Sequence, residues 1–169
     1  MHIRQALSVD AAPLSRLACA TYVEHFAPLW GEAGLAAYLE SEFSVPALSR
    51  GLAAADQAWF LVGDDDGLAG FAKVNWSRRE PQSRMLGAEL RKIYFRADRV
   101  GRGHGAQLLA HVMDVARRHG ETHLWLNVLA RNTGAQRFYL RHGLAHLGAS
   151  VLHTDVGPLE MLAMGRALD

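Results

Sequence analysis

Three glycines, Gly101, Gly103 and Gly105, lie where an apolar strand pattern gives way to a helical one. The residues before them, Glu89 to Phe95, read ELRKIYF, and the helical pattern continues to about His119. Glycine lets the backbone approach a ligand closely, and the unpaired N–H groups of a first helical turn point towards an anion. The stretch therefore predicts a phosphate-binding turn between a strand and a helix.

Other types of phosphate-binding turn require other residues in the sequence. The letters GRGHGA also satisfy G-x-G-x-x-G/A, the dinucleotide-binding pattern. Against that reading, the next strand pattern, His123 to Leu129, has no acidic residue at its end to hold a ribose, and the motif comes late, after a hairpin. A P-loop is excluded because Gly-Lys-Ser/Thr is absent. A glycine turn without a ligand is the remaining reading, and three glycines at a helix start are costly in backbone entropy.

The elements that must position this turn follow from periodicity and turn residues. The pattern predicts an α+β fold: a mixed, mostly antiparallel central sheet of about seven strands flanked by helices, in one domain spanning residues 1–169. The strand–helix–strand unit from Glu89 to Leu129 should be parallel. The expected strands are 2–7, 58–63, 68–76, 89–95, 123–129, 144–151 and 159–165, and the expected helices are 14–26, 35–43, 47–55, 103–119 and 132–140, with a break at 44–46 and a loop at 77–87.

Composition narrows the class of protein. The formal net charge is +1, which gives no field for binding nucleic acid, and no apolar run is long enough to cross a membrane. The N-terminus has no signal-peptide core, so a cytoplasmic protein is expected, with a homodimer left open. The single cysteine, Cys19, excludes an internal disulfide and is expected to pack. No cluster of histidines with cysteines occurs, and Asp64 to Asp66 lack the downstream ligand of a calcium loop, so no metal is expected and these aspartates are predicted to form a solvated turn.

The glycine stretch resembles the acyl-CoA signature of the GNAT superfamily of N-acyltransferases, Q/R-x-x-G-x-G/A, from Val100 to Gly105. A second stretch, LNVLARNTGAQRFYLRHGL, beginning at Leu126, is similar to the superfamily's strand–Asn–helix–FY–G segment. Helix, hairpin, signature and this segment occur in the superfamily's order across nearly the whole chain. Val100 departs from the Gln or Arg of the first motif position, and Arg99 or Arg102 could supply the missing charge.

The resemblance implies the acyl-CoA N-acyltransferase fold and acetyl-CoA as co-substrate, with direct attack of an amine on the thioester. A backbone N–H in the segment Ile93 to Phe95 would polarise the thioester carbonyl, and the N–H groups of the glycine turn would bind the pyrophosphate. Asn132 would contact the pantetheine arm, cap its helix, or do both. The implied cofactor-binding residues are Ile93, Tyr94, Phe95, Gly101, Arg102, Gly103, His104, Gly105, Ala106 and Asn132. Arg141 is either a further phosphate contact or a solvated arginine.

Two residues are the catalytic candidates that the resemblance implies. Tyr139 falls on the FY tyrosine and would donate a proton to the departing thiolate, although a core aromatic is the alternative. Glu89 would act as general base through water, with a surface glutamate as the alternative. Strand alternation puts Arg91 on the same face as Glu89, where it would hold the carboxylate ionised.

The amine acceptor is the part of the predicted reaction that the sequence specifies least. The segments AYLESEF, GFAKVNW and ELRKIYF, with the C-terminal segment, look similar to bacterial polyamine acetyltransferases, so a polyamine is the first hypothesis for a small-molecule primary amine. Arg91 departs from the acidic residue that those enzymes tend to carry. The candidate acceptor contacts are Glu24, His25, Tyr38 and Glu42. A peptide α-amine, an amino acid and an aminoglycoside are alternative acceptors, and a non-catalytic CoA-binding sensor is an alternative from another class.

Overall fold

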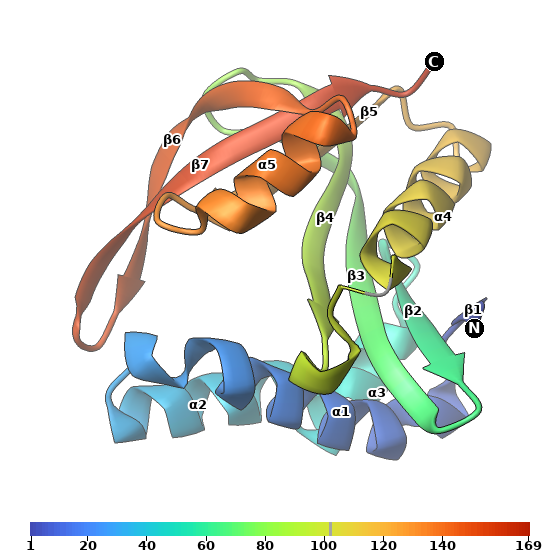
Figure 1. Ribbon diagram of the computed structural model, residues 1–169, viewed down its shortest axis with the longest axis vertical. Coiled ribbons are helices and arrows are strands. Elements are labelled where there is room, and N and C mark those ends of the chain that lie inside the picture. Colours follow the sequence, from blue (N-terminus) through green and yellow to red (C-terminus); the bar gives the residue numbers. More distant parts are fainter. Residues whose placement is uncertain (102) are drawn as a thin grey trace.

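The computed structural model describes residues 1–101 and 103–169 as a seven-stranded sheet with helices on both faces (Figure 1). The strand order is β1-β2-β3-β4-β5-β7-β6, and all pairs are antiparallel except β4 with β5. The strands are β1 (His2–Gln5), β2 (Gln57–Asp64), β3 (Gly67–Arg79), β4 (Leu86–Phe95), β5 (His123–Leu129), β6 (Ala145–Thr154) and β7 (Gly157–Ala167). The helices are α1 (Ala11–Phe26), α2 (Glu32–Phe43), α3 (Val45–Ala53), α4 (His104–Arg118) and α5 (Thr133–Arg141). The α+β prediction with a mixed, mostly antiparallel sheet is confirmed.

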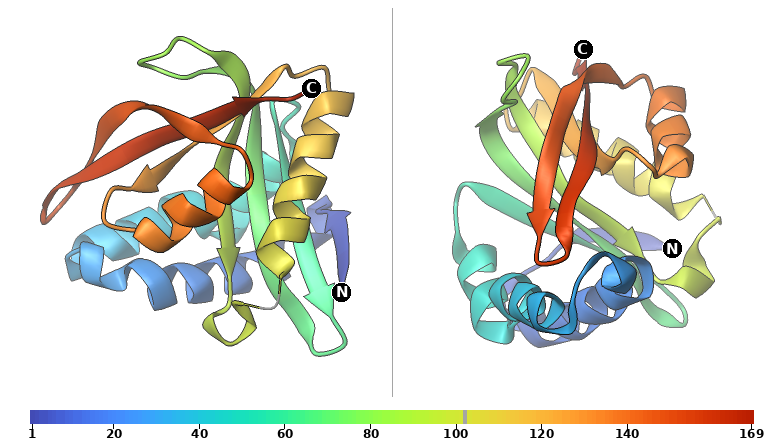
Figure 2. Two further views of the ribbon diagram at one scale, coloured as in Figure 1. Left: turned by 45° about the horizontal axis from the view of Figure 1, so that its top comes forward. Right: turned by 90° about the vertical axis from the view of Figure 1, so that its left-hand side faces the viewer.

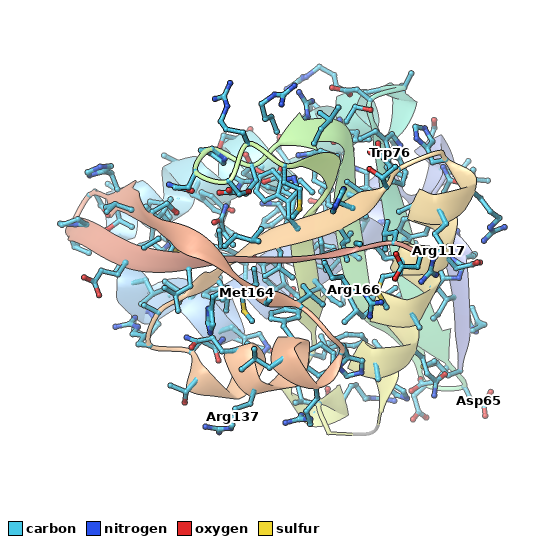
Figure 3. The ribbon with its side chains drawn as sticks, turned by 90° about the horizontal axis from the view of Figure 1, so that it is seen from above. Asp65, Trp76, Arg117, Arg137, Met164 and Arg166 are labelled. Carbon is cyan, nitrogen blue, oxygen red and sulfur yellow. The ribbon has the colours of Figure 1, made fainter. Side chains whose placement is uncertain are left out.

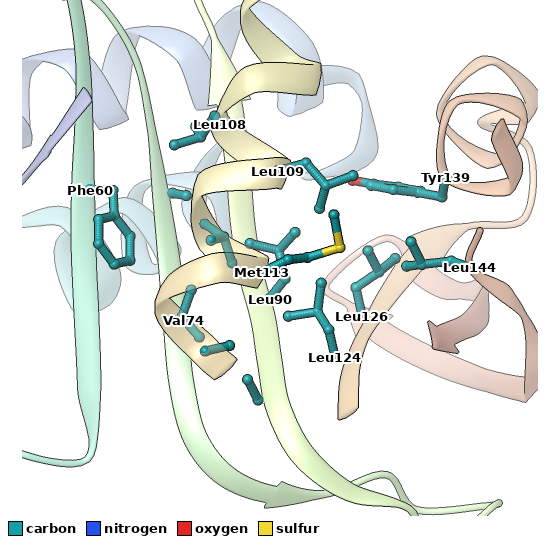
Figure 4. Close-up of a cluster of buried hydrophobic side chains, with 14 of the residues drawn as sticks. Phe60, Val74, Leu90, Leu108, Leu109, Met113, Leu124, Leu126, Tyr139 and Leu144 are labelled. Carbon is teal, nitrogen blue, oxygen red and sulfur yellow. The ribbon is translucent and has the colours of Figure 1, made fainter. Parts of the chain in front are cut away.

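The helices cover the sheet in two layers because successive strand residues face opposite sides. In β2, Phe60 and Val62 join the core beneath α4, whereas Trp59 and Leu61 join the core beneath α1 and α3. Figure 4 shows the first of these cores, in which Leu108 and Leu109 of α4 lie over β3 and β4. In the described part of the chain, no helix is long and apolar enough to cross a membrane.

The two parallel strands part soon after they meet. β4 and β5 pair at Ala88–Leu124 and Glu89–Trp125, the only register pairs between them in the described chain. From Leu90 to Phe95, β4 continues along β3 while β5 continues along β7, so the sheet opens into a V (Figure 1). Backbone groups on this edge of β4 therefore have no strand partner from β5, which is the condition for a main-chain ligand site.

A bulge in β4 lies at the mouth of this opening. Lys92 pairs with Lys73 and Leu90 with Val74 on β3, so Arg91 is an extra residue without an opposite partner. The bulge reverses the alternation of side chains. Leu90, Ile93 and Phe95 consequently lie on the α4 side, whereas Lys92 and Tyr94 pack towards α1 and α2.

Two local bounds differ from the prediction. The expected loop 77–87 is shorter and spans 80–85, because β3 runs to Arg79 and β4 starts at Leu86, with the turn closed by Glu80, whose Oε2 accepts from the N–H groups of Gln82 and Ser83. The expected break at 44–46 is confirmed at Ser44, whose extended backbone separates α2 from α3, but Val45 and Pro46 already belong to α3. Ser44 caps α3 and Pro46 occupies its first turn, where proline leaves no hydrogen bond unmade.

Candidate active site

The opening between β4 and β5 contains a cavity of about 1020 Å³. Its walls are the free edge of β4, the glycine turn that follows it, and α5. The lining residues include Ile93, Tyr94, Phe95, Val100, Gly101, Gly103, Gly105, Ala106, Arg131, Asn132, Phe138, Tyr139 and Arg141. Most of the candidate cofactor residues from the sequence thus lie on one surface. Arg102 lies outside the described residues, and His104 is not among the lining residues.

The glycine turn is shaped by two left-handed residues. Gly101 has a φ of 83° and Gly103 a φ of 79°, conformations that other residues adopt only with strain. Gly103 is the N-cap of α4, so the turn aims the first N–H groups of this helix at the cavity. A Cβ on Gly105 would lie 3.6 Å from Phe138 Cζ and 3.9 Å from Phe95 Cε2, which places the helix start between β4 and α5.

Arg99 anchors this turn and does not supply the free charge that Val100 lacks. Its Nη1 lies 2.5 Å from Asp64 Oδ2 and 3.1 Å from Asp66 Oδ2, in the β2–β3 turn. Asp64 and Asp66, which were expected to lie in a solvated turn, therefore hold the glycine turn in place. No cluster of potential metal ligands occurs among the described residues.

Tyr139 reaches the cavity from α5 and is only 7% exposed. In Figure 4 its ring extends from α5 towards Leu109 of α4. Burial raises the pKa of the phenol well above its ordinary value of 10.0. The hydroxyl therefore stays protonated at neutral pH, as a proton donor requires.

Asn132 and Arg141 lie at the two ends of α5. Asn132 Oδ1 caps the helix by accepting from Ala135 N at 3.1 Å, and the residue also lines the cavity. Arg141, in the last turn, lines the cavity too. Arg137 is exposed and points away from the body of the protein (Figure 3).

A smaller cavity of about 220 Å³ adjoins the first. The two cavities share a wall made mainly from both sides of the V opening. The acceptor candidate Tyr38 and the catalytic candidate Glu89 line only the smaller cavity. The shared residues are Phe26, Leu29, Leu90, Arg91, Lys92, Tyr94, Asn127, Leu129 and Met161. A group held in one cavity can thus meet a group held in the other at the point where β4 leaves β5.

Glu89 is held from two sides. Its Oε2 accepts from Asn75 Nδ2 at 2.8 Å, and its Oε1 lies 3.6 Å from Arg91 Nη1. The side chain is 12% exposed. The predicted proximity of Arg91 and Glu89 is confirmed, although it arises across the bulge and not from regular alternation.

Glu42 is part of a buried network with Lys92 and Tyr38. Lys92, whose side chain is 1% exposed, lies 2.9 Å from Glu42 Oε2 and donates to Tyr38 Oη at 2.9 Å. Burial alone would raise the pKa of Glu42, but the nearby Lys92, Lys73 and Arg91 outweigh it and hold this pKa below its ordinary value. Burial raises the pKa of Tyr38 to about 12.

Glu24 and His25 were expected to contact the acceptor, but their side chains bind the backbone at the end of β4. Glu24 Oε2 accepts from Ala97 N at 3.0 Å, and His25 Nε2 donates to Phe95 O at 2.8 Å. Both side chains tie α1 to the end of β4. His25 lines the larger cavity, and neither residue is among those lining the smaller one.

Sequence reasoning missed Lys92, Asn75 and Asp155. A lysine within a predicted central strand was the available signal for Lys92, because buried lysines are rare unless they are paired. Asp155, in the β6–β7 turn, accepts from Gly31 N at 2.9 Å and from Gly34 N at 3.0 Å. No local sequence pattern predicts that contact.

Comparison with known proteins agrees with this geometry. The model of the acetyltransferase (GNAT) family matches residues 19–144. Streptothricin acetyltransferase of Streptomyces lavendulae is 37% identical over 95 residues, which cover 56% of this chain. The match spans about half of that relative, 48% of its length.

Solved structures share the fold. PaiA N-acetyltransferase from Thermoplasma acidophilum, crystallised with coenzyme A, superposes with a TM-score of 0.74 at 19% identity, covering 98% of each chain. Nourseothricin acetyltransferase gives a TM-score of 0.57 at 28% identity, covering 68% of this chain and 67% of that one. The architecture is that of the acyl-CoA N-acyltransferases.

Proposed function

Because the chain belongs to the GNAT acetyltransferase family, we propose that it transfers the acetyl group of acetyl-CoA to a primary amine bound in the smaller cavity. The observation that carries the proposal is the V opening between β4 and β5. There the glycine turn, the free edge of β4 and the hydroxyl-bearing ring of Tyr139 border one cavity, which adjoins a second lined by Glu89.

The larger cavity suits acetyl-CoA, the co-substrate of this family. Gly101, Gly103 and the first turn of α4 offer backbone N–H groups to the pyrophosphate, and a Cβ at Gly101 or Gly103 would meet no described atom within 4 Å, so the turn is open to a ligand. Arg131 and Arg141 supply cations on the same wall. The co-substrate supplies an activated acetyl thioester, whose carbonyl would be polarised by an N–H of the free β4 edge.

Tyr139 and Glu89 have the proton-transfer roles in this proposal. An alkyl ammonium has a pKa near ~10, so the acceptor must lose a proton before it can attack. Glu89 takes that proton through water, and Tyr139 donates a proton to the departing thiolate. The phenol of Tyr139 carries its proton at neutral pH, as a donor must. Attack is direct. Cys19 is in neither cavity lining, and burial raises the pKa of its thiol.

The identity of the amine is a narrower question. A polyamine is one candidate, from the resemblance of AYLESEF and ELRKIYF. A streptothricin is the second candidate, favoured by the 37% identity to streptothricin acetyltransferase over 95 residues. A peptide α-amine, an amino acid and an aminoglycoside are further acceptors to test. A CoA-binding sensor without catalysis would bind the same cofactor and transfer nothing.

The test is thiol release from acetyl-CoA on incubation of the purified protein with a panel of amines. We expect amine-dependent release, and an acetylated amine by mass spectrometry. Binding of CoA by calorimetry without release for any amine would support the sensor. Binding of NADH that CoA does not displace would instead support the dinucleotide reading.

A further inference from the structure

We infer that the acceptor is a small primary amine with a single positive charge and an apolar body, an inference that rests on the proposed function. The smaller cavity, at about 220 Å³, is below the roughly 300–1,000 Å³ of sites for drug-sized ligands. Its lining combines one carboxylate with aromatic rings and a set of interlocked charges. Three features of this lining and of the residues that pair with it lead to the inference.

The first feature is that Glu42, which does not line the cavity but pairs with the lining residue Lys92, is not free to bind a second ammonium. Its Oε2 lies 2.9 Å from Lys92 Nζ, which is itself almost completely buried. The same ammonium donates to Tyr38 and lies over the rings of Tyr38 and Phe43, at 5.3 Å and 5.1 Å from their centroids. A buried cation with this many partners cannot leave Glu42 without a large desolvation cost. The carboxylate that would recognise a polycation is already neutralised.

The second feature is the balance of charge around the cavity. Lys73 stands opposite Lys92 in the β3–β4 register, and Arg91 lies beside Glu89. The charged residues that line the cavity are two cations, Arg91 and Lys92, and one carboxylate, Glu89, a net charge of +1. Glu89 can receive the reacting ammonium, whereas any second ammonium would be repelled.

The third feature is the aromatic wall. Five aromatic residues line the cavity, and two of them, Tyr22 and Tyr38, stack at 4.5 Å between centroids. Each of the two hydroxyl oxygens already accepts a hydrogen bond, Tyr22 Oη from Trp30 Nε1 at 3.1 Å and Tyr38 Oη from Lys92. The aromatic rings therefore present mainly apolar surface to a ligand. The five aromatic lining residues are Tyr22, Phe26, Trp30, Tyr38 and Tyr94.

The β6–β7 hairpin limits the length of the amine. Ser150, Val151 and Leu152 of β6 line the cavity, and the hairpin tip lies over α2 (Figure 2). Asp155 fixes it there through the N–H groups of Gly31 and Gly34. The approach is so close that a Cβ on Gly34 would lie 2.2 Å from Asp155 Cγ. The wall is therefore held at a defined distance from the aromatic rings.

The experiment compares kcat/KM for phenethylamine, tyramine, putrescine and spermidine in the wild-type protein, with thiol release as the readout. We expect phenethylamine or tyramine to exceed both polyamines by about tenfold or more, since each extra ammonium meets a net positive site. The Lys92→Met variant frees Glu42 and removes one cation, so it should reduce this ratio about tenfold. The double variant Lys92→Met/Glu42→Gln removes the freed carboxylate and should restore the preference for the monoamines.

The outcomes separate this inference from the proposed function. Preference of the wild-type protein for putrescine or spermidine would overturn the inference and leave acetyl transfer intact. Absence of release with every amine would overturn both. Circular dichroism identifies a variant that does not fold, and the wild-type ratio then decides alone.

Discussion

The two adjoining cavities are built from different parts of the chain. The larger one has three backbone features in its walls: a strand edge without a partner from β5, a turn with two left-handed glycines, and the first turn of α4. The smaller one is bounded by long side chains whose charges and hydroxyls already satisfy one another, such as Lys92 with Glu42 and Tyr38.

This difference explains why the larger cavity can be recognised from the sequence more readily than the smaller one. Backbone recognition of a phosphate needs glycine at fixed positions, so it leaves a local signature. A side-chain site can be built from many combinations of residues brought together by the fold. We therefore expect changes at the larger cavity to act on every acceptor equally, and changes at the smaller cavity to act on some acceptors only.

The largest effect is expected at Tyr139, which lines the larger cavity. Tyr139→Phe should lower kcat by about 10²-fold or more, because it removes the proton donor. The KM for acetyl-CoA should stay within about twofold, since the ring still fills its place. The pKa of the wild-type phenol is raised, so its proton is retained as pH rises, and the wild-type kcat should not fall through ionisation of Tyr139 below about pH 10. An unchanged kcat in the variant would remove Tyr139 from the mechanism.

Glu89 tests the acceptor side of the same reaction. Glu89→Gln keeps the hydrogen-bonding shape beside Asn75 but cannot take a proton, so kcat/KM should fall about tenfold or more. The acidic limb of the pH–rate profile should disappear as well. An acidic limb that persists in the variant would assign the base to another group.

The two arginines of α5 provide a matched pair for the cofactor side. Arg141 lines the larger cavity, whereas Arg137 points away from the protein (Figure 3). Arg141→Ala should raise the KM for acetyl-CoA by about two- to fivefold, the size of an exposed charge contact, and for all amines alike. Arg137→Ala should leave this KM unchanged. Equal effects of both variants would mean that the helix contributes only a general positive field.

The smallest effect is expected at Asp155, which acts through the hairpin wall. Asp155→Ala should raise the KM for the amine about twofold while the KM for acetyl-CoA stays constant. Gly34→Ala should do the same, because its Cβ would overlap the carboxylate. Combining the two substitutions should add nothing further, since both break one contact. Additive effects, or an equal rise in both KM values, would argue against this role.

Much of the fold and the cofactor side could be predicted from sequence because the signals are local. The glycine turn follows its strand directly, and Asn132 and Tyr139 share one helical segment. The structure then places Gly101, Gly103, Asn132 and Tyr139 on one cavity. The parallel β4–β5 pair also follows from a local strand–helix–strand unit.

The acceptor side could not be predicted because its contacts are long-range. The bulge at Arg91 depends on the register with β3, and it reverses which side chains of β4 face α2. Lys92 meets Tyr38 from 54 positions away, and Asp155 meets Gly31 from 124 positions away. Glu42 was expected to attract a cationic amine, but the fold supplies it with a lysine.

The central claim is that an acetyl group passes directly from the larger cavity to an amine in the smaller one, across their shared wall. Initial rates measured while acetyl-CoA and a turned-over amine are varied together test it most directly. Direct transfer requires both substrates to be bound at once, so double-reciprocal plots should intersect, and the protein mixed with acetyl-CoA alone should gain no acetyl group by mass spectrometry. Parallel lines, with an acetylated protein that passes its acetyl group to the amine, would contradict the account.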